Sequence, residues 1–126
     1  MNPTIKFSHN WNNKLNNEVF TTIRTYSQEK WKYYIGLKDK IFDVVLNGKK
    51  IREVKLIRID NDSFDLISEY LLVLDTGETS ITKVYEIFRK FGLKNADDKM
   101  IILTFRDYAL PQNKEASKWI KILNST

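Results

Sequence analysis

The feature that most constrains the fold of this chain is the segment KIFDVVLNGKKIREVKLIRID, residues 40–60. Two strand-like runs flank Asn47-Gly48, and both of these residues tolerate the positive φ angles that a tight hairpin requires. Phe42 and Val44 share one face of the first arm. The second arm is apolar on both faces over part of its length, which favours a bend, a bulge or a barrel. The sequence therefore predicts a central antiparallel hairpin.

Further strands and helices surround this hairpin. The β-branched and aromatic runs TIKFS, EVFTTIRT and KMIILTFRDY favour three more strands. The segment TSITKVYEIFRKFG has apolar residues at i, i+3, i+4 and i+7 and ends at Gly92, which predicts a helix. A short helix is expected near 66–72, and a C-terminal helix at about 112–123. Strands outnumber helices, so the predicted class is α+β, with a small, mostly antiparallel barrel flanked by helices.

Size and composition limit the function classes. With 126 residues the chain is expected to form one domain, 1–126. Zero cysteines exclude a disulfide framework and a thiolate metal site, and His9 is the only histidine, so no metal and no cofactor are expected. No apolar run reaches the ~20 residues of a membrane span, and the start lacks a signal-peptide layout. We expect a cytoplasmic protein, monomeric or weakly dimeric, that does not enter a membrane.

Candidate binding residues cluster in VFTTIRTY, residues 19–26. The two-residue period of a strand places Thr22 and Arg24 on one side and Thr21 and Ile23 on the other. Arginine offers a planar fork of donors suited to phosphate or a base edge, and threonine adds a hydroxyl. An ordinary exposed strand face is the alternative.

The next segment, QEKWKYY, combines lysines with aromatic residues. Lys32 could contact phosphate, and Trp31 and Tyr34 could stack on bases, as recognition of single-stranded RNA requires. The alternative is that two of the three aromatic residues belong to the core. Lys38 could add a positive charge to the rim of the same site. The net charge of +5 suits a phosphate-bearing partner without requiring one.

In order, the pieces IKFS, W and KL, TTIR, YYIGLKDKI and ILTFR resemble the ASCH domain, a relative of the PUA RNA-binding fold. The resemblance runs from about Ile5 to Arg106. It implies a small PUA-like β-barrel flanked by helices, with a cleft beside it that takes RNA or nucleotide-like ligands. It also implies that Thr22 and Arg24 face this cleft.

One branch of this family comprises small amidohydrolases that remove the acetyl group from N4-acetylcytidine. These enzymes resemble this chain at Thr22 and Arg24, but they carry a lysine where this chain has Val19. They also need a glutamate ahead of the long helix, where Asp75 and Glu78 are both near. Because the lysine is missing, we expect little or no hydrolysis of N4-acetylcytidine.

Three functions follow from these observations. The first is a module that binds RNA or a nucleotide-like ligand in a basic cleft. The second is a small hydrolase acting on modified nucleosides or RNA, with Asp75 or Glu78 as its carboxylate and Lys14 or Lys38 as its amine. The third is a protein-interaction domain that uses the helix around Trp119. An acid, a base and a threonine gathered in one closed pocket favour the enzyme. An open basic groove favours RNA, and an exposed apolar patch around Trp119 favours a protein partner.

Overall fold

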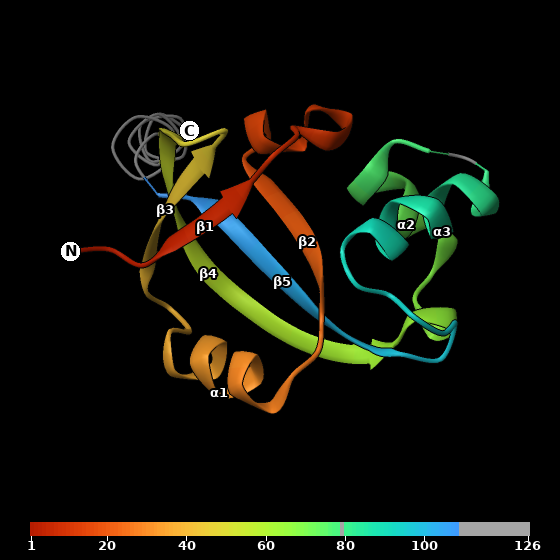
Figure 1. The fold of residues 1–126 in the computed structure, drawn as a ribbon. Coiled ribbons are helices and arrows are strands. Elements are labelled where there is room, and N and C mark those ends of the chain that lie inside the picture. The colour runs from red at the N-terminus through yellow and green to blue at the C-terminus, as the bar shows by residue number, and fades with distance from the viewer. Residues whose placement is uncertain (79, 109–126) are drawn as a thin grey trace, which may run out of the picture.

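The computed structural model describes residues 1–78 and 80–108, which form one curved sheet with helices around it (Figure 1). The strands are β1 (Thr4–Phe7), β2 (Val19–Thr25), β3 (Ile41–Leu46), β4 (Lys49–Ser63) and β5 (Lys99–Asp107). Their order is β1-β3-β4-β5-β2; β1 runs parallel to β3, and the other neighbours are antiparallel. Within residues 1–78 and 80–108 the sheet is therefore a half-barrel whose free edges are β1 and β2. The predicted α+β class, with a mostly antiparallel sheet flanked by helices, is confirmed.

The helical elements are η1 (Trp11–Asn16), α1 (Gln28–Gly36), η2 (Phe64–Leu66), α2 (Glu69–Thr76) and α3 (Ile81–Lys90). In Figure 1, α2 and α3 lie together beside β2, and α1 lies apart from them. The Ser27 and Ser68 hydroxyls accept hydrogen bonds from the N–H groups of the first turns of α1 and α2. The short helix expected near 66–72 is divided between η2 and α2. The C-terminal helix expected at about 112–123 lies outside the described residues.

The predicted hairpin joins β3 to β4, with φ angles of 51° at Asn47 and 80° at Gly48. Register shifts lie between Val44 and Val45 in β3, and between Leu56 and Arg58 along β4. Such irregularities bend a strand and increase its twist. The predicted bend in the long second arm is confirmed, and it curves the sheet into a half-barrel.

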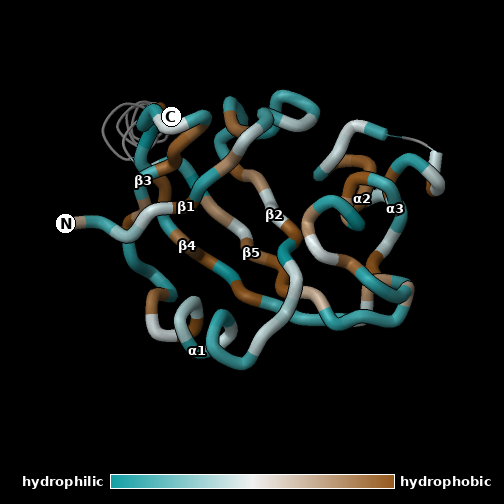
Figure 2. Tube along the Cα trace, in the orientation of Figure 1, coloured by the Kyte–Doolittle hydropathy of each residue, from teal (hydrophilic) through white to brown (hydrophobic). Residues whose placement is uncertain are grey.

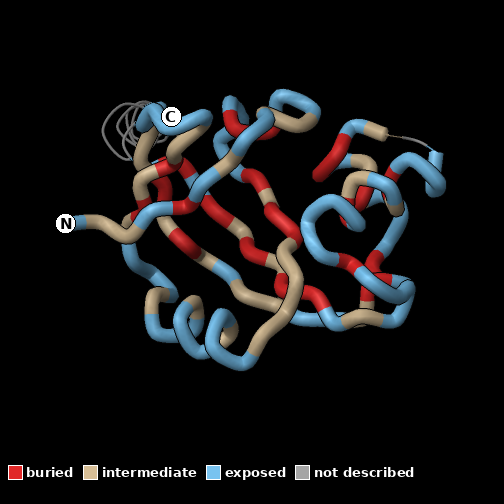
Figure 3. The backbone as a smooth tube through the Cα atoms, viewed as in Figure 1, coloured by how far each residue is buried: buried red, intermediate tan, exposed pale blue. Residues whose placement is uncertain are grey.

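Two hydrophobic cores lie on opposite faces of this sheet. The first contains Phe42, Leu56 and Phe105, and the second lies beneath α2 and α3 around Phe64 and Phe88. Figures 2 and 3 show apolar and buried segments along the strands and on the sides of α2 and α3 that face the sheet. From the sequence alone, the apolar pattern predicts one core instead, shared by Phe42, Ile102, Leu103 and Phe105 and closed by the α3 segment.

That expectation was wrong because β5 is apolar on both faces. Leu103 and Phe105 point into the first core, whereas Ile102, which was expected to join them, contacts the second. None of the described helices is both long and apolar enough to cross a membrane.

Candidate ligand pocket between the free edges of the sheet

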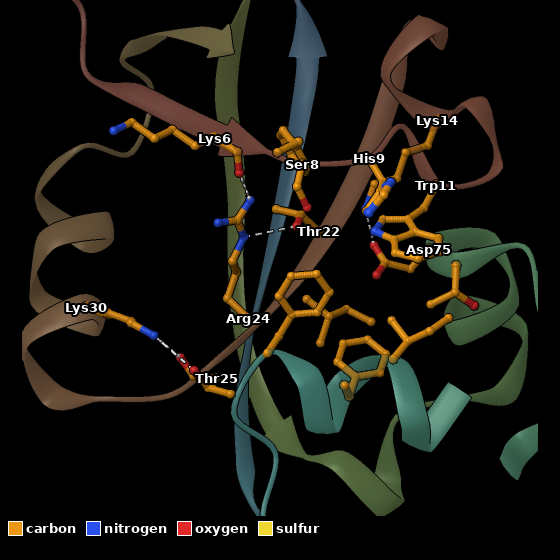
Figure 4. A pocket seen from close by; sticks show the side chains of 16 residues that line it. Lys6, Ser8, His9, Trp11, Lys14, Thr22, Arg24, Thr25, Lys30 and Asp75 are labelled. Atoms are coloured by element: carbon orange, nitrogen blue, oxygen red, sulfur yellow. Dashed lines mark hydrogen bonds and ion pairs between the residues drawn. The ribbon is translucent and has the colours of Figure 1, made fainter. Parts of the chain in front are cut away.

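A pocket of about 200 Å³ lies between the two free edges of the sheet. Its walls come from β1 and the residues after it, β2, η1, the start of α1, α2 and α3. Figure 4 shows the side chains that line it. Because β1 and β2 share no ladder, the half-barrel is open at this position. The pocket is therefore a consequence of the strand order.

Arg24 bridges the two free edges. Its Nε donates to the Thr22 hydroxyl at 3.2 Å, and its Nη2 donates to the Lys6 carbonyl oxygen at 2.9 Å. The guanidinium carbon lies 4.9 Å from the centre of the Phe7 ring, a cation–π contact. Thr22 is buried. Strand alternation thus brings Thr22 and Arg24 to the same pocket.

The charge of Arg24 lacks a carboxylate partner. Among residues 1–78 and 80–108, no Asp or Glu forms an ion pair with it. Burial lowers the pKa of Arg24, whereas Tyr34 and Asp75 act in the opposite direction. Its two hydrogen bonds use two of five N–H donors. This cation can therefore still bind an anion.

Lys14 of η1 and Asp75 of α2 form a buried ion pair. Lys14 Nζ lies 2.5 Å from Asp75 Oδ1, and the two side chains are only 5% and 7% exposed. Burial lowers the pKa of Lys14 and raises that of Asp75, while their mutual attraction opposes both shifts. Lys14 Nζ also lies 5.5 Å from the centre of the Phe7 ring. The pocket therefore holds an acid and an amine whose proton affinities have moved towards each other.

The local sequence explains how η1 reaches α2. Asn12 and Asn13 adopt left-handed φ angles of 52° and 57°, which asparagine tolerates better than most residues. The Asn12 side-chain amide donates to the Leu74 carbonyl oxygen at 3.4 Å. Gly77, with φ of 77°, ends α2, and a Cβ built there would lie 3.1 Å from that of Asn12. This close approach positions Lys14 beside Asp75.

The pocket has two chemically different sides (Figure 4). Arg24 and Lys30 lie on one side, where the Lys30 ammonium donates to the Thr25 hydroxyl at 2.9 Å and the Lys6 side chain points away from Arg24. The other side holds the Lys14–Asp75 pair, with the His9 and Trp11 rings 4.9 Å apart. One side therefore suits an anion, and the other suits a ring with polar substituents.

The structure places the remaining candidate residues outside this pocket. Lys38 follows α1 and lies 3.3 Å from Asp39 Oδ2, with half of its side chain exposed. Val19 begins β2 and is 48% exposed. Glu78 follows Gly77, and its backbone N–H donates to the Thr76 hydroxyl at 3.2 Å. Of the two acids and two amines considered for an enzyme, the pocket brings Asp75 and Lys14 together.

The basic-aromatic run is helical, and its aromatic side chains divide between core and solvent. Trp31 and Tyr34 are half-buried against the first core, and Tyr34 lies 6.4 Å from the Phe42 ring. Lys32 and Tyr33 are exposed. None of these four lines the pocket described above.

The sequence did not reveal the pocket's aromatic wall. Phe7 follows an ordinary amphipathic strand pattern, and Trp11 shares a helical face with Leu15, as a core residue does. Phe91 reads as the end of a helix. The three rings line one pocket because β1, η1 and the end of α3 lie around it, and no local pattern encodes that arrangement.

No family model matches the sequence, and no curated protein is recognisably similar to it. Its structure is similar to the crystal structure of an ASCH domain from Lactobacillus crispatus, with a TM-score of 0.58 and 17% identity. The likeness covers 83% of this chain and 78% of that one. The chain thus has an ASCH-like fold.

Proposed function

We propose that the pocket binds a nucleotide-like ligand whose phosphate is held by Arg24. The observation that carries this proposal is a half-buried guanidinium with free donors and no carboxylate partner among the described residues. A guanidinium in this situation recognises planar or tetrahedral oxyanions well. Lys30 adds a positive charge on the same side of the pocket. An ASCH-like fold is consistent with a nucleic-acid-binding module of the PUA-like kind.

The rest of the pocket suits one base. Phe7, Trp11 and Phe91 provide aromatic surface, and base–aromatic stacking contributes about 1–3 kcal/mol per base. The volume of about 200 Å³ is below the typical ligand-pocket range of roughly 300–1,000 Å³. A single nucleotide, free or at the end of an RNA strand, fits this size better than a folded RNA surface.

A second candidate is hydrolysis of an acylated nucleoside. The Lys14–Asp75 pair lines the same pocket as Thr22, although Val19 stands where the amidohydrolase branch has its lysine. Burial lowers the pKa of Lys14, so a larger share of this amine is available as a base than for an exposed lysine. In such a reaction the acyl C–N bond breaks, water is consumed, and a free amine and a carboxylate leave.

The binding proposal predicts a specific loss when Arg24 is replaced. Wild-type protein should bind ribonucleoside 5′-monophosphates more tightly than the same nucleosides, in titrations followed by calorimetry. In Arg24→Met, monophosphate affinity should fall about 10- to 100-fold, the range of one lost charge-assisted contact. The advantage over the nucleoside should disappear.

The matched control is Arg58→Met. Arg58 is 71% exposed and pairs with Asp60 outside this pocket, so the charge change is the same. Its affinity should stay within about twofold of wild type. Equal losses in both variants, or no binding of any monophosphate or short RNA, would remove the proposal. Thermal unfolding of each variant establishes that the folded protein is being titrated.

The hydrolysis candidate predicts cytidine release from N4-acetylcytidine, measured chromatographically. Thr22→Val should abolish that release, because it removes the pocket hydroxyl while keeping the side-chain shape. Thr21→Val is the control, since Thr21 lies on the opposite side of β2 and outside this pocket. If wild-type protein releases no cytidine, the second candidate fails for this substrate and binding remains the proposed function.

A further inference from the structure

The hydrogen-bond register of β2 determines which of its backbone groups face the pocket. β2 is an edge strand, and among the described residues it pairs only with β5. Just outside the strand ends, Asp107 N donates to the Glu18 carbonyl at 2.7 Å, and Tyr26 N donates to the Lys99 carbonyl at 3.1 Å. In an antiparallel pair, hydrogen-bonded residues alternate with residues directed away. The even-numbered residues of β2 therefore bond to β5, and the odd-numbered residues direct their N–H and C=O groups to the free edge.

Ile23 is the odd-numbered residue at the middle of this edge. Its side chain is buried in the second core, only 6% of the residue is exposed, and yet it lines the pocket. The pocket also takes Thr22 and Arg24 from one face of β2, and Phe88 from α3 on the other. A cavity lined from both faces of an edge strand passes along that edge. The backbone of Ile23 therefore faces the pocket.

Neighbouring edge groups already have partners. The Lys6 carbonyl accepts from Arg24, and the Thr25 carbonyl accepts from Lys30 Nζ at 3.3 Å. In contrast, no hydrogen bond within the described residues uses the N–H or C=O of Ile23. Buried backbone groups are nearly always hydrogen-bonded, to protein or to another molecule. This donor and acceptor are thus available at a pocket wall.

We propose that the Ile23 N–H and C=O read the donor–acceptor edge of the ligand's base. This inference rests on the proposed nucleotide binding. In a strand, the N–H and C=O of one residue point to the same side, which gives a donor beside an acceptor. Each nucleobase presents an adjacent acceptor and donor on its Watson–Crick edge, and proteins read unpaired bases there. An edge strand can instead pair with an extended peptide. The aromatic walls and small volume favour a flat ring.

The inference can be tested by blocking the Watson–Crick edge of the base with methyl groups, which add no charge. The four ribonucleoside monophosphates are titrated first. The tightest is then compared with its methylated analogue, which is N3-methyl-UMP, N1-methyl-GMP, N6,N6-dimethyl-AMP or N4,N4-dimethyl-CMP. Each methylation removes the donor that lies next to the edge acceptor, and it keeps the ring and the phosphate. We expect at least a tenfold loss of affinity, because a site built around a hydrogen bond rejects ligands that cannot make it.

Amide resonances distinguish this hydrogen bond from a steric effect of the methyl groups. In 15N-labelled protein, the parent nucleotide should move the Ile23 amide proton downfield and slow its exchange with solvent. The Ile102 amide, on the partner strand and directed towards β4, is the control and should change little.

The possible outcomes separate the two proposals. Nucleotide binding that leaves the Ile23 amide unshifted and unprotected overturns this inference while the proposed function stands. Equal affinity for parent and methylated nucleotides does the same. If no nucleotide binds, the proposed function fails and this inference fails with it.

Discussion

Replacing Lys14 by methionine should lower the free energy of unfolding by about 3–5 kcal/mol, the usual cost of leaving one member of a buried ion pair without its partner. Both side chains of the Lys14–Asp75 pair are almost fully buried, so water solvates the remaining carboxylate poorly. Urea denaturation monitored by circular dichroism measures the loss. A loss below about 1 kcal/mol would show that solvent reaches the pair.

The pH dependence of this variant has a definite sign. Burial raises the pKa of Asp75, so its folded state binds the carboxyl proton more tightly than the unfolded state does. Without Lys14 this effect is stronger. The stability of Lys14→Met should therefore rise as the pH falls towards about 4, the ordinary pKa of aspartate, and its deficit should be larger at neutral pH.

A double-mutant cycle separates the pair from its surroundings. Lys14→Met/Asp75→Asn should lose clearly less stability than the sum of the two single changes, because no unpaired charge remains. The exposed Arg58–Asp60 pair is the control, and Arg58→Met should cost no more than about 1 kcal/mol. Strict additivity at Lys14 and Asp75 would contradict the interpretation.

This pair also has consequences for function. The ion pair holds η1, which contains Trp11, against α2, although Lys14 and Asp75 are 61 positions apart in the sequence. Because the pair shapes the pocket as well as lining it, Lys14 variants change stability and ligand affinity together. Arg24 and Thr22 are better positions for testing binding alone, since neither forms an ion pair among the described residues.

Local patterns predicted the elements that depend on neighbouring residues. Asn47-Gly48 specified the hairpin, and the spacing of Val84 and Phe88 specified α3. Helix α1 was not predicted. Its residues Tyr33 and Ile35 are exposed, so the apolar residues of this segment do not form one buried stripe. The arrangement of these elements in space could not be predicted in the same way, because it depends on contacts between residues far apart in the sequence.

The candidate site shows the same division. Strand alternation in TTIR was enough to pair Thr22 with Arg24. The sequence left Asp75 and Glu78, and Lys14 and Lys38, as open alternatives, because no spacing rule connects residues about 60 positions apart. Packing of η1 on α2 selects Lys14 with Asp75. No sequence pattern indicates that the N–H and C=O of Ile23 face the free edge of β2, because this depends on the order of the strands in the sheet.

Truncating Phe88 to alanine should lower the free energy of unfolding by about 3–5 kcal/mol, because a buried aromatic side chain leaves a cavity. Phe88 is 3% exposed, and its ring lies 5.0 Å from that of Phe64 in the second core. Phe91→Ala makes the same chemical change just after α3, where the residue is 51% exposed, and should cost less than about 1 kcal/mol.

Denaturation of these two variants tests how α3 is held. A large loss for Phe88 with a small one for Phe91 means that the second core fixes the helix and leaves the wall of the pocket at Phe91 free for a ligand. Similar small losses would mean that α3 is loosely attached. The pocket wall that α3 provides would then form only when a ligand binds, and affinity would fall in both variants.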